Sequence, residues 1–137
     1  NCAKVSLQLA KDGYLGAEFL SVIPGSIGGA IYMNAGAYDK EIADIVDKVL
    51  ILDKDGNIKL IEKNECEFNY RCSKFKEKTS IILGTIIQLN KSVKEKPLEK
   101  IKYYVSNKRT NQPLNARSAG STFVNPKGIK AWKVIDN

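Results

Sequence analysis

Three stretches of the sequence carry groups that could do chemistry: residues 24–38, 70–73 and 118–123. The first holds four of the ten glycines in the chain. Because glycine permits a close backbone approach, and because amides at the start of a helix attract anions, this stretch could hold a phosphate or a flat cofactor. Tight packing of a glycine- and alanine-rich helix against a sheet explains the same glycines equally well, so both interpretations stay open.

The other two stretches offer a cation and a hydroxyl. Arg71 follows Tyr70, and a guanidinium there could bind a carboxylate or phosphate through two parallel hydrogen bonds. The commoner role for such an arginine is a surface pair with a glutamate. Ser121 follows Gly120, where a hydroxyl on a tight turn could donate a proton, although such serines more often close turns or cap helices. The chain has no histidine, which excludes Ser-His-Asp and Cys-His catalysis within it and disfavours a zinc site.

The composition is that of a globular protein with a basic surface. A length of 137 residues suits one domain or a domain and a piece, and the first residue is not Met, so we expect part of a longer protein. The net charge of +7 arises from a lysine-rich surface or from an anionic partner. Scattered lysines without interleaved aromatic residues argue against a nucleic-acid groove.

Two further features bear on the compartment. No run of about 18 apolar residues is present, so we expect no membrane span and no membrane partner. The three cysteines, Cys2, Cys66 and Cys72, are odd in number and lack the spacing of a disulfide framework. They indicate reduced thiols and therefore the cytoplasm.

The elements that would position the polar stretches follow from periodicity and turn residues. Ser26 is a candidate N-cap, and the Asp55-Gly56 pair is a hairpin turn because its glycine adopts positive φ easily. We expect helices over residues 4–12, 27–33, from 97 onward and over 129–135, strands over 48–53, 58–61 and 80–89, and a helical turn over 64–68. The sequence thus predicts an α+β chain, with one unit over residues 1–110 and the beginning of another over 111–137.

Four motifs in a fixed order resemble the family of UDP-N-acetylenolpyruvoylglucosamine reductases, known as MurB. They lie at residues 23–42, at 68–75 (Tyr-Arg-x-Ser-x-Phe), at 108–114 (Arg-Arg-x-x-Gln-Pro in the family) and at 118–126 (Ser-Ala-Gly-Ser-x-Phe-Lys-Asn-Pro in the family). Together they cover nearly the whole chain. The resemblance implies the second subdomain of a PCMH-type FAD-binding domain, followed by the start of the family's C-terminal substrate domain.

The family's chemistry is implied in the same way. In peptidoglycan synthesis NADPH reduces FAD, hydride passes to the β-carbon of an enolpyruvyl ether, and a serine protonates the α-carbon. The resemblance makes Ser121 the proton donor and Arg71 the group that binds the substrate carboxylate. It implies that Gly25, Ser26, Gly28, Gly29, Asn34, Gly36, Ala37 and Arg109 bind the cofactor, and that Tyr70, Gln112 and Asn125 bind the UDP-sugar substrate.

The chain also departs from the family pattern. Val124 replaces the usual lysine, Cys72 takes the variable position after Arg71, and the lack of a long insertion after Tyr70 resembles the shorter, type II branch. The family's first phosphate-binding subdomain and its catalytic glutamate have no counterpart in these 137 residues. We therefore expect the isolated chain to bind FAD weakly and to turn over no substrate.

Other functions stay open. Another flavin oxidoreductase of the PCMH type is one alternative, and the motif around Ser121 argues against it. A noncatalytic nucleotide-binding module would use the positive charge, and a folded remnant would bind nothing. A flavin absorbance spectrum would separate the two flavin enzymes, the MurB-type reductase and the other oxidoreductase, from the nucleotide-binding module and the remnant. The sequence leaves the oligomeric state and the preference for NADPH over NADH open.

Overall fold

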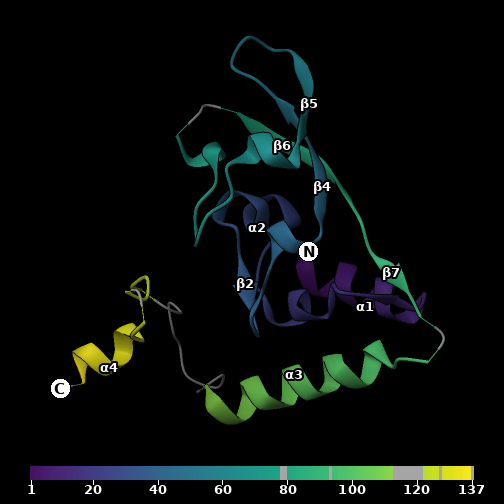
Figure 1. Ribbon diagram of the computed structural model, residues 1–137, viewed down its shortest axis with the longest axis vertical. Coiled ribbons are helices and arrows are strands. Elements are labelled where there is room, and N and C mark those ends of the chain that lie inside the picture. The colour runs from purple at the N-terminus through teal and green to yellow at the C-terminus, as the bar shows by residue number, and fades with distance from the viewer. Residues whose placement is uncertain (78–79, 93, 113–121, 127, 137) are drawn as a thin grey trace.

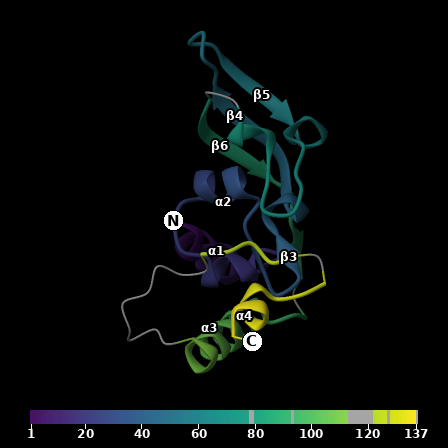
Figure 2. The ribbon, with the colours of Figure 1, turned by 90° about the vertical axis from the view of Figure 1, so that its left-hand side faces the viewer.

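The computed structural model of the chain describes residues 1–77, 80–92, 94–112, 122–126 and 128–136. In chain order, with η for 3-10 helices, the elements are α1 (Cys2–Lys11), β1 (Tyr14–Leu15), η1 (Glu18–Val22), α2 (Ile27–Met33), β2 (Gly36–Ala37), β3 (Lys40–Glu41), η2 (Ile42–Asp44), β4 (Val46–Leu52), β5 (Ile58–Glu62), η3 (Lys63–Cys66), η4 (Lys74–Lys76), β6 (Ile81–Ile87), β7 (Asn90–Lys91), α3 (Pro97–Asn111) and α4 (Ala131–Ile135). The expected α+β class is confirmed. Figures 1 and 2 show the β4–β5 hairpin at one end, then α2 and α1, and α3 with α4 at the other end.

The main sheet has three antiparallel strands in the order β5-β4-β6. The central strand β4 pairs with both neighbours, so that Leu50 lies opposite Leu60 on one side and Gly84 on the other. The strands end within two residues of the predicted bounds. The β-rich apolar runs and the turn residues between two of them therefore predicted these strands correctly.

The β4–β5 hairpin closes on the predicted Asp-Gly turn. Gly56 has φ +82°, and Asp53 Oδ1 accepts hydrogen bonds of 2.9 Å from the backbone N–H groups of Asp55 and Asn57. Asp53 Oδ2 lies 2.6 Å from Lys59 Nζ. The hydrogen bond from Lys59 and those from the turn amides lower the pKa of Asp53 to about 2.

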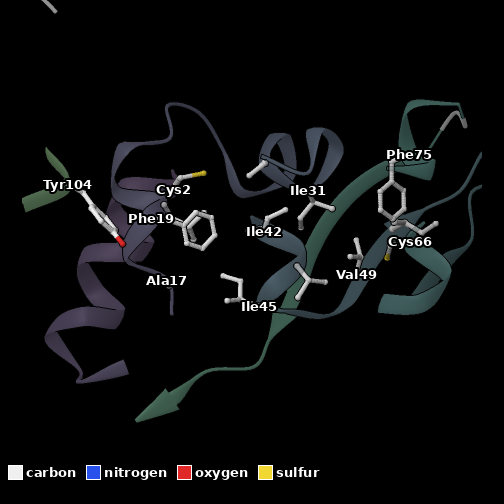
Figure 3. Packing of buried hydrophobic residues seen from close by; sticks show 14 residues of the cluster. Cys2, Ala17, Phe19, Ile31, Ile42, Ile45, Val49, Cys66, Phe75 and Tyr104 are labelled. Carbon is white, nitrogen blue, oxygen red and sulfur yellow. The ribbon is translucent and has the colours of Figure 1, made fainter. Parts of the chain in front are cut away.

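One apolar core runs through the molecule from α3 to the loop after η3. Figure 3 shows Tyr104 of α3 at one end, Phe19, Ile42, Ile31 and Val49 between, and Phe75 at the other end. Helix α2 packs on one face of the sheet, and its Gly28 faces Ile82 of β6, where an added Cβ would lie 3.7 Å away. The core thus fixes α2 between the sheet and α1.

Helix α3 is held across η1 by a buried carboxylate. The side chain of Glu18 is almost fully buried; its Oε2 accepts from the backbone N–H of Gly16 at 2.9 Å, and its Oε1 lies 3.8 Å from Lys100 Nζ of α3. Near the other end of α3, Lys108 Nζ donates to the backbone oxygen of Val22 at 2.7 Å. The two contacts place α3 along η1, with Lys100 beside Glu18 at its start and Lys108 beside Val22 at its end.

Within the described ranges, none of the helices is both long and apolar enough to cross a bilayer. The same residues contain no cluster of three or more cysteine or acidic side chains suited to a metal ion. Helix α3 ends at Asn111, next to the boundary predicted after residue 110. The division into two units there stays a prediction.

Candidate functional site

The start of helix α2 is an exposed turn with little side chain over it. Ser26 is the N-cap, and its Oγ accepts from the backbone N–H of Gly29 at 3.1 Å, as predicted. Gly25 has φ +113°, a conformation that side chains rarely adopt, and an added Cβ there would meet nothing within 4 Å. Because the first N–H groups of a helix have no partner within it, this turn offers amide donors to an anion from solvent.

The glycines divide between the two interpretations of their segment. Gly25 is exposed and open, as a ligand site requires. Gly28 faces the sheet, and Gly29 leaves room for the capping oxygen of Ser26, which would lie 3.3 Å from an added Cβ. At Gly36 an added Cβ would collide with the backbone oxygen of Lys40, so this glycine is needed by the β2–β3 hairpin itself. Of the four glycines, only Gly36 is required by internal packing, since an added Cβ would be tight at Gly29 and in ordinary contact at Gly28.

Asn34 ends helix α2 in the left-handed conformation, with φ 42° and ψ 56°. The backbone N–H of Ala35 donates to Ala30 O at 2.8 Å and that of Asn34 to Ile31 O at 3.2 Å, which is a Schellman motif. The side chain is fully buried. Its Nδ2 donates to Asn69 O at 2.9 Å, and its Oδ1 accepts from the N–H of Ala43 at 3.1 Å.

The burial of the Asn34 amide bears on the cofactor contact that was predicted for this residue. Both of its polar atoms are engaged within the chain, and none of the side chain reaches the surface. The expectation that this side chain faces a cofactor therefore does not fit the structure. Burial could not be read from the sequence, because an asparagine after a helix serves equally well as a ligand or as a cap.

Arg71 lies on a tight loop that docks against the same helix end. Asn69 and Cys72 form an antiparallel bridge, and Arg71 between them has φ 52°. Its Nη1 donates to Asn34 O at 3.3 Å and its Nη2 to Gly36 O at 3.0 Å. The alternative of a surface pair with a glutamate is not observed, since no carboxylate of the described residues forms an ion pair with Arg71.

Two predicted substrate residues meet beside this loop. Tyr70 is half exposed, and its ring centroid lies 4.8 Å from Cζ of Arg71. Its hydroxyl accepts from Asn125 Nδ2 at 3.2 Å. Asn125 Oδ1 in turn accepts from the N–H of Ala131 at the start of α4, at 2.9 Å. The structure thus joins Tyr70 and Asn125, which are far apart in the sequence.

The opposite wall comes from α3 and the turn between β2 and β3. The Tyr38 ring stacks on Tyr104, and its hydroxyl donates to the backbone oxygen of Tyr104 at 2.9 Å. Burial, followed by the charges of neighbouring Tyr103 and Tyr104, raises the pKa of the Tyr38 phenol. The phenol therefore stays a neutral donor at physiological pH.

A cleft of about 880 Å³ lies between these walls. Its lining includes Gly36, Ala37, Arg71, Lys108, Gln112 and Trp132. Three cations face this space, because Lys130 joins Arg71 and Lys108. The cleft is therefore suited to an anionic ligand that also offers an apolar surface to Trp132 and Tyr38.

The other expected residues fall in three places. Ser121 lies outside the described residues. Arg109 is exposed on α3 and is not among the residues that line the cleft. Gly25, Ser26 and Gly29 lie at the start of α2, whereas Arg71, Gly36, Ala37 and Gln112 line the cleft.

Sequence reasoning gave no role to several cleft residues. Lys108 and Tyr38 were within the motifs but carried no assignment, and Lys130 and Trp132 were in a predicted helix. Trp132 is the one tryptophan of the chain and is more than half exposed. A solitary tryptophan on a short helix was the signal that could have identified it.

Known proteins resemble this chain in sequence and in fold. A family model described as "FAD binding domain" matches residues 1–61, which include the start of α2 and the β2–β3 hairpin. The chain is 43% identical over 134 residues to the UDP-N-acetylenolpyruvoylglucosamine reductase of Clostridium tetani, and 45% identical over 125 residues to that of Carboxydothermus hydrogenoformans. Along nearly its whole length, the chain is thus similar to the UDP-N-acetylenolpyruvoylglucosamine reductases.

The solved structure of the MurB enzyme from Thermus caldophilus agrees with this similarity. It superposes with a TM-score of 0.86 at 31% identity, over 98% of this chain and 49% of that chain. The Clostridium tetani and Carboxydothermus hydrogenoformans matches cover 98% and 91% of this chain and 44% and 41% of those relatives. The chain thus spans less than half the length of the MurB relatives that it matches.

The residues at the start of α2 fit the cofactor of this family. FAD carries two phosphates, and the turn at Gly25 and Ser26 presents exposed amides with no acidic side chain in the first turn of the helix. The expected cofactor, FAD, agrees with the matched family model. The individual contacts predicted for Gly25, Ser26, Gly28, Gly29, Gly36, Ala37 and Arg109 stay predictions.

Proposed function

We propose that this chain forms the cofactor- and substrate-facing part of an FAD-dependent reductase that converts UDP-N-acetylenolpyruvoylglucosamine to UDP-N-acetylmuramate in peptidoglycan synthesis. The relatives that it matches along nearly its whole length carry the name of that enzyme. NADPH is the proposed reductant. The proposed compartment is the cytoplasm, in keeping with three cysteines that form no disulfide in the structure.

The observation that carries the proposal is the position of Arg71. Its guanidinium lines the cleft while two of its N–H groups are held by the carbonyls of Asn34 and Gly36. A guanidinium has five N–H donors, so three remain for a ligand. A cation fixed by neutral carbonyls keeps its full charge, which suits the enolpyruvyl carboxylate of the substrate.

The arginine also supports the chemical step. When hydride adds to the β-carbon of the enolpyruvyl group, negative charge develops on the α-carbon and spreads into the carboxylate. A fixed cation beside that carboxylate stabilises the charge more in the transition state than in the ground state. Bound FAD would supply the hydride, and the exposed amides near Gly25 and Ser26 would hold its phosphates.

The remaining roles rest on the family resemblance. We assign to Ser121 the donation of a proton to the α-carbon, which completes the addition of hydride and proton across the double bond. Tyr70 and Asn125, joined by their hydrogen bond, would present one polar surface to the UDP-sugar, and Gln112 would face it from the lining of the cleft.

The test is the substitution Arg71→Met in the full-length protein that contains this chain, with Arg71→Lys beside it. We expect Arg71→Met to lower kcat/KM for UDP-N-acetylenolpyruvoylglucosamine on the order of 100-fold, because the developing charge loses its partner. Arg71→Lys keeps the positive charge but not the two parallel N–H donors of a guanidinium, and its kcat/KM should fall less than that of Arg71→Met. The measurement is NADPH oxidation at 340 nm, together with the visible flavin absorbance of each variant.

A matched control removes an exposed cation elsewhere. Lys63→Met on η3 changes the net charge by the same amount and lies outside the cleft. It should keep the kinetics of the unsubstituted chain. Retention of full activity by Arg71→Met, or a full-length protein containing this chain that neither binds flavin nor oxidises NADPH with this substrate, would overturn the proposal.

A further inference from the structure

The loop that carries Arg71 is attached to the C-terminal end of helix α2 and to the strand that follows it through three carbonyls, at alternate residues. Ser73 Oγ donates to Tyr32 O at 2.8 Å, and Arg71 donates to Asn34 O and Gly36 O. Carbonyls at the end of a helix lack partners within the helix and carry its negative dipole end. The arginine therefore satisfies acceptors that would otherwise need water.

Asn34 is the residue on which both sides of this contact depend. Its left-handed backbone turns its own carbonyl toward Nη1 of Arg71. Its side-chain Nδ2 holds Asn69 O at 2.9 Å, and Asn69 begins the loop whose tip is Arg71. Its Oδ1 accepts from the N–H of Ala43 at 3.1 Å, and this hydrogen bond attaches Asn34 to η2.

Few residues could replace Asn34 in this role. Asparagine tolerates the left-handed conformation better than other residues with a Cβ, and it supplies a donor and an acceptor on one short side chain. Because the side chain is fully buried, each of its hydrogen bonds forms away from water, where an unpaired amide would be costly.

We propose that Asn34 is a positioning residue that sets the guanidinium of Arg71 at the wall of the cleft. The cofactor-facing start of α2 and the carboxylate-binding arginine are thereby parts of one rigid unit, joined through the two ends of a seven-residue helix. This inference rests on the proposed function of Arg71, and it assigns to Asn34 a role toward substrate rather than toward FAD.

The first experiment compares two ligands that differ in one group. UDP-N-acetylenolpyruvoylglucosamine carries the carboxylate and UDP-N-acetylglucosamine lacks it, and their Kd values are measured by calorimetry on the FAD-loaded full-length protein that contains this chain, without NADPH. Asn34→Gly keeps the left-handed backbone and the carbonyl but removes both side-chain hydrogen bonds. We expect Asn34→Gly to raise the Kd of the carboxylate ligand about tenfold and to leave the Kd of the other ligand unchanged, because only the arginine is misplaced.

Two controls separate positioning from general destabilisation. Val49→Ala makes a cavity in the core at β4 without removing a hydrogen bond of the arginine loop, and should leave both Kd values unchanged. In an Arg71→Met background, Asn34→Gly should have no further effect on either ligand. Asn34→Asp retains the shape and the acceptor for Ala43 but loses the donor, and should act in the same direction as Asn34→Gly.

A second measurement does not depend on any ligand. The Nη–H protons of Arg71 are held by two carbonyls, so their exchange with solvent, followed by NMR in the ¹⁵N-labelled full-length protein, should be faster in Asn34→Gly and unchanged in Val49→Ala. Unchanged exchange in Asn34→Gly, or an equal loss of affinity for both ligands, would overturn the positioning role. If Arg71→Met binds the carboxylate ligand as tightly as the unsubstituted chain, the proposed function itself fails.

Discussion

Tyr38 stacks on Tyr104 with ring centroids 3.9 Å apart and ring planes within 8° of parallel. Tyr38 and Asp39, the two central residues of the β2–β3 turn, have φ 54° and 58°. Such a turn usually uses Asn-Gly, because a bulky residue resists positive φ. The stack and the hydrogen bond from the Tyr38 hydroxyl therefore offset backbone strain, and they attach the cleft's hairpin to α3.

Two substitutions at Tyr38 separate the stack from the hydrogen bond. Tyr38→Phe keeps the stacked ring and should cost about 1 kcal/mol of unfolding free energy, the value of one hydrogen bond. Tyr38→Asn relieves the backbone but loses the ring, and should cost about 2 to 3 kcal/mol if stacking dominates. Urea unfolding followed by circular dichroism would measure both. A Tyr38→Asn variant as stable as the unsubstituted chain would show that the strain outweighs the stack.

Ser26 offers a way to separate capping from cofactor binding. Ser26→Ala removes the acceptor for the N–H of Gly29 and should lower stability by about 1 kcal/mol, with little effect on FAD affinity. Ser26→Asp keeps an N-cap acceptor and should keep the stability. Its negative charge would repel a phosphate at the exposed amides, so FAD binding, measured by flavin fluorescence, should weaken.

If Ser26→Asp bound FAD as tightly as the unsubstituted chain, the phosphates would not lie at the start of α2. Ser26→Ala is the matched control in that titration, because it changes the same atom without adding charge. Both variants should be compared in thermal unfolding without FAD, so that a loss of fold is not mistaken for a loss of affinity.

Gly36 should tolerate no side chain. Gly36→Ala places a Cβ against the backbone oxygen of Lys40 and should cost about 2 to 3 kcal/mol through displacement of the hairpin. It should also weaken substrate binding, because the Gly36 carbonyl holds Arg71. Gly84→Ala on β6, where an added Cβ meets nothing within 4 Å, is the matched control and should change stability by about 0.5 kcal/mol at most.

The Asp53–Lys59 pair should make stability depend on pH at the acid end. The pKa of Asp53 is lowered in the folded state to about 2 from its ordinary value of 3.8. Its contribution is therefore fully present above the unfolded pKa and is lost as the pH falls through the folded pKa. In urea unfolding between pH 5 and pH 2, Asp53→Asn should show a shallower decline of stability than the unsubstituted chain. Parallel declines would exclude Asp53 as the titrating group.

Local features of the sequence were enough for most of the elements. The N-cap Ser26, the Asp55-Gly56 turn and Pro97 at the start of α3 each act through their immediate neighbours, and the structure confirms all three. Runs of valine, leucine and isoleucine predicted β4 and β6, because such residues favour strands. Such signals need no knowledge of distant residues.

In the candidate site too, some features followed from the sequence and others depended on the tertiary structure. Motif order and residue types identified the family resemblance and singled out Arg71 and the turn at Gly25, and relatives of the same name support that resemblance. Which glycines serve packing depended on tertiary contacts, since Gly28 meets β6 and Gly36 meets its hairpin partner only in the folded chain. The pairing of Tyr70 with Asn125 lay equally beyond sequence reasoning, because it joins segments far apart in the chain.

What the sequence determined by itself was therefore the family resemblance, the α+β class and the chemical types at hand: a cation, amide donors and no histidine. Only the tertiary structure decided that Asn34 is buried and holds Arg71 instead of facing FAD. The physical reason is that an asparagine offers the same donor and acceptor to a ligand or to a neighbouring loop. Which of the two it meets depends on where the rest of the chain places the loop.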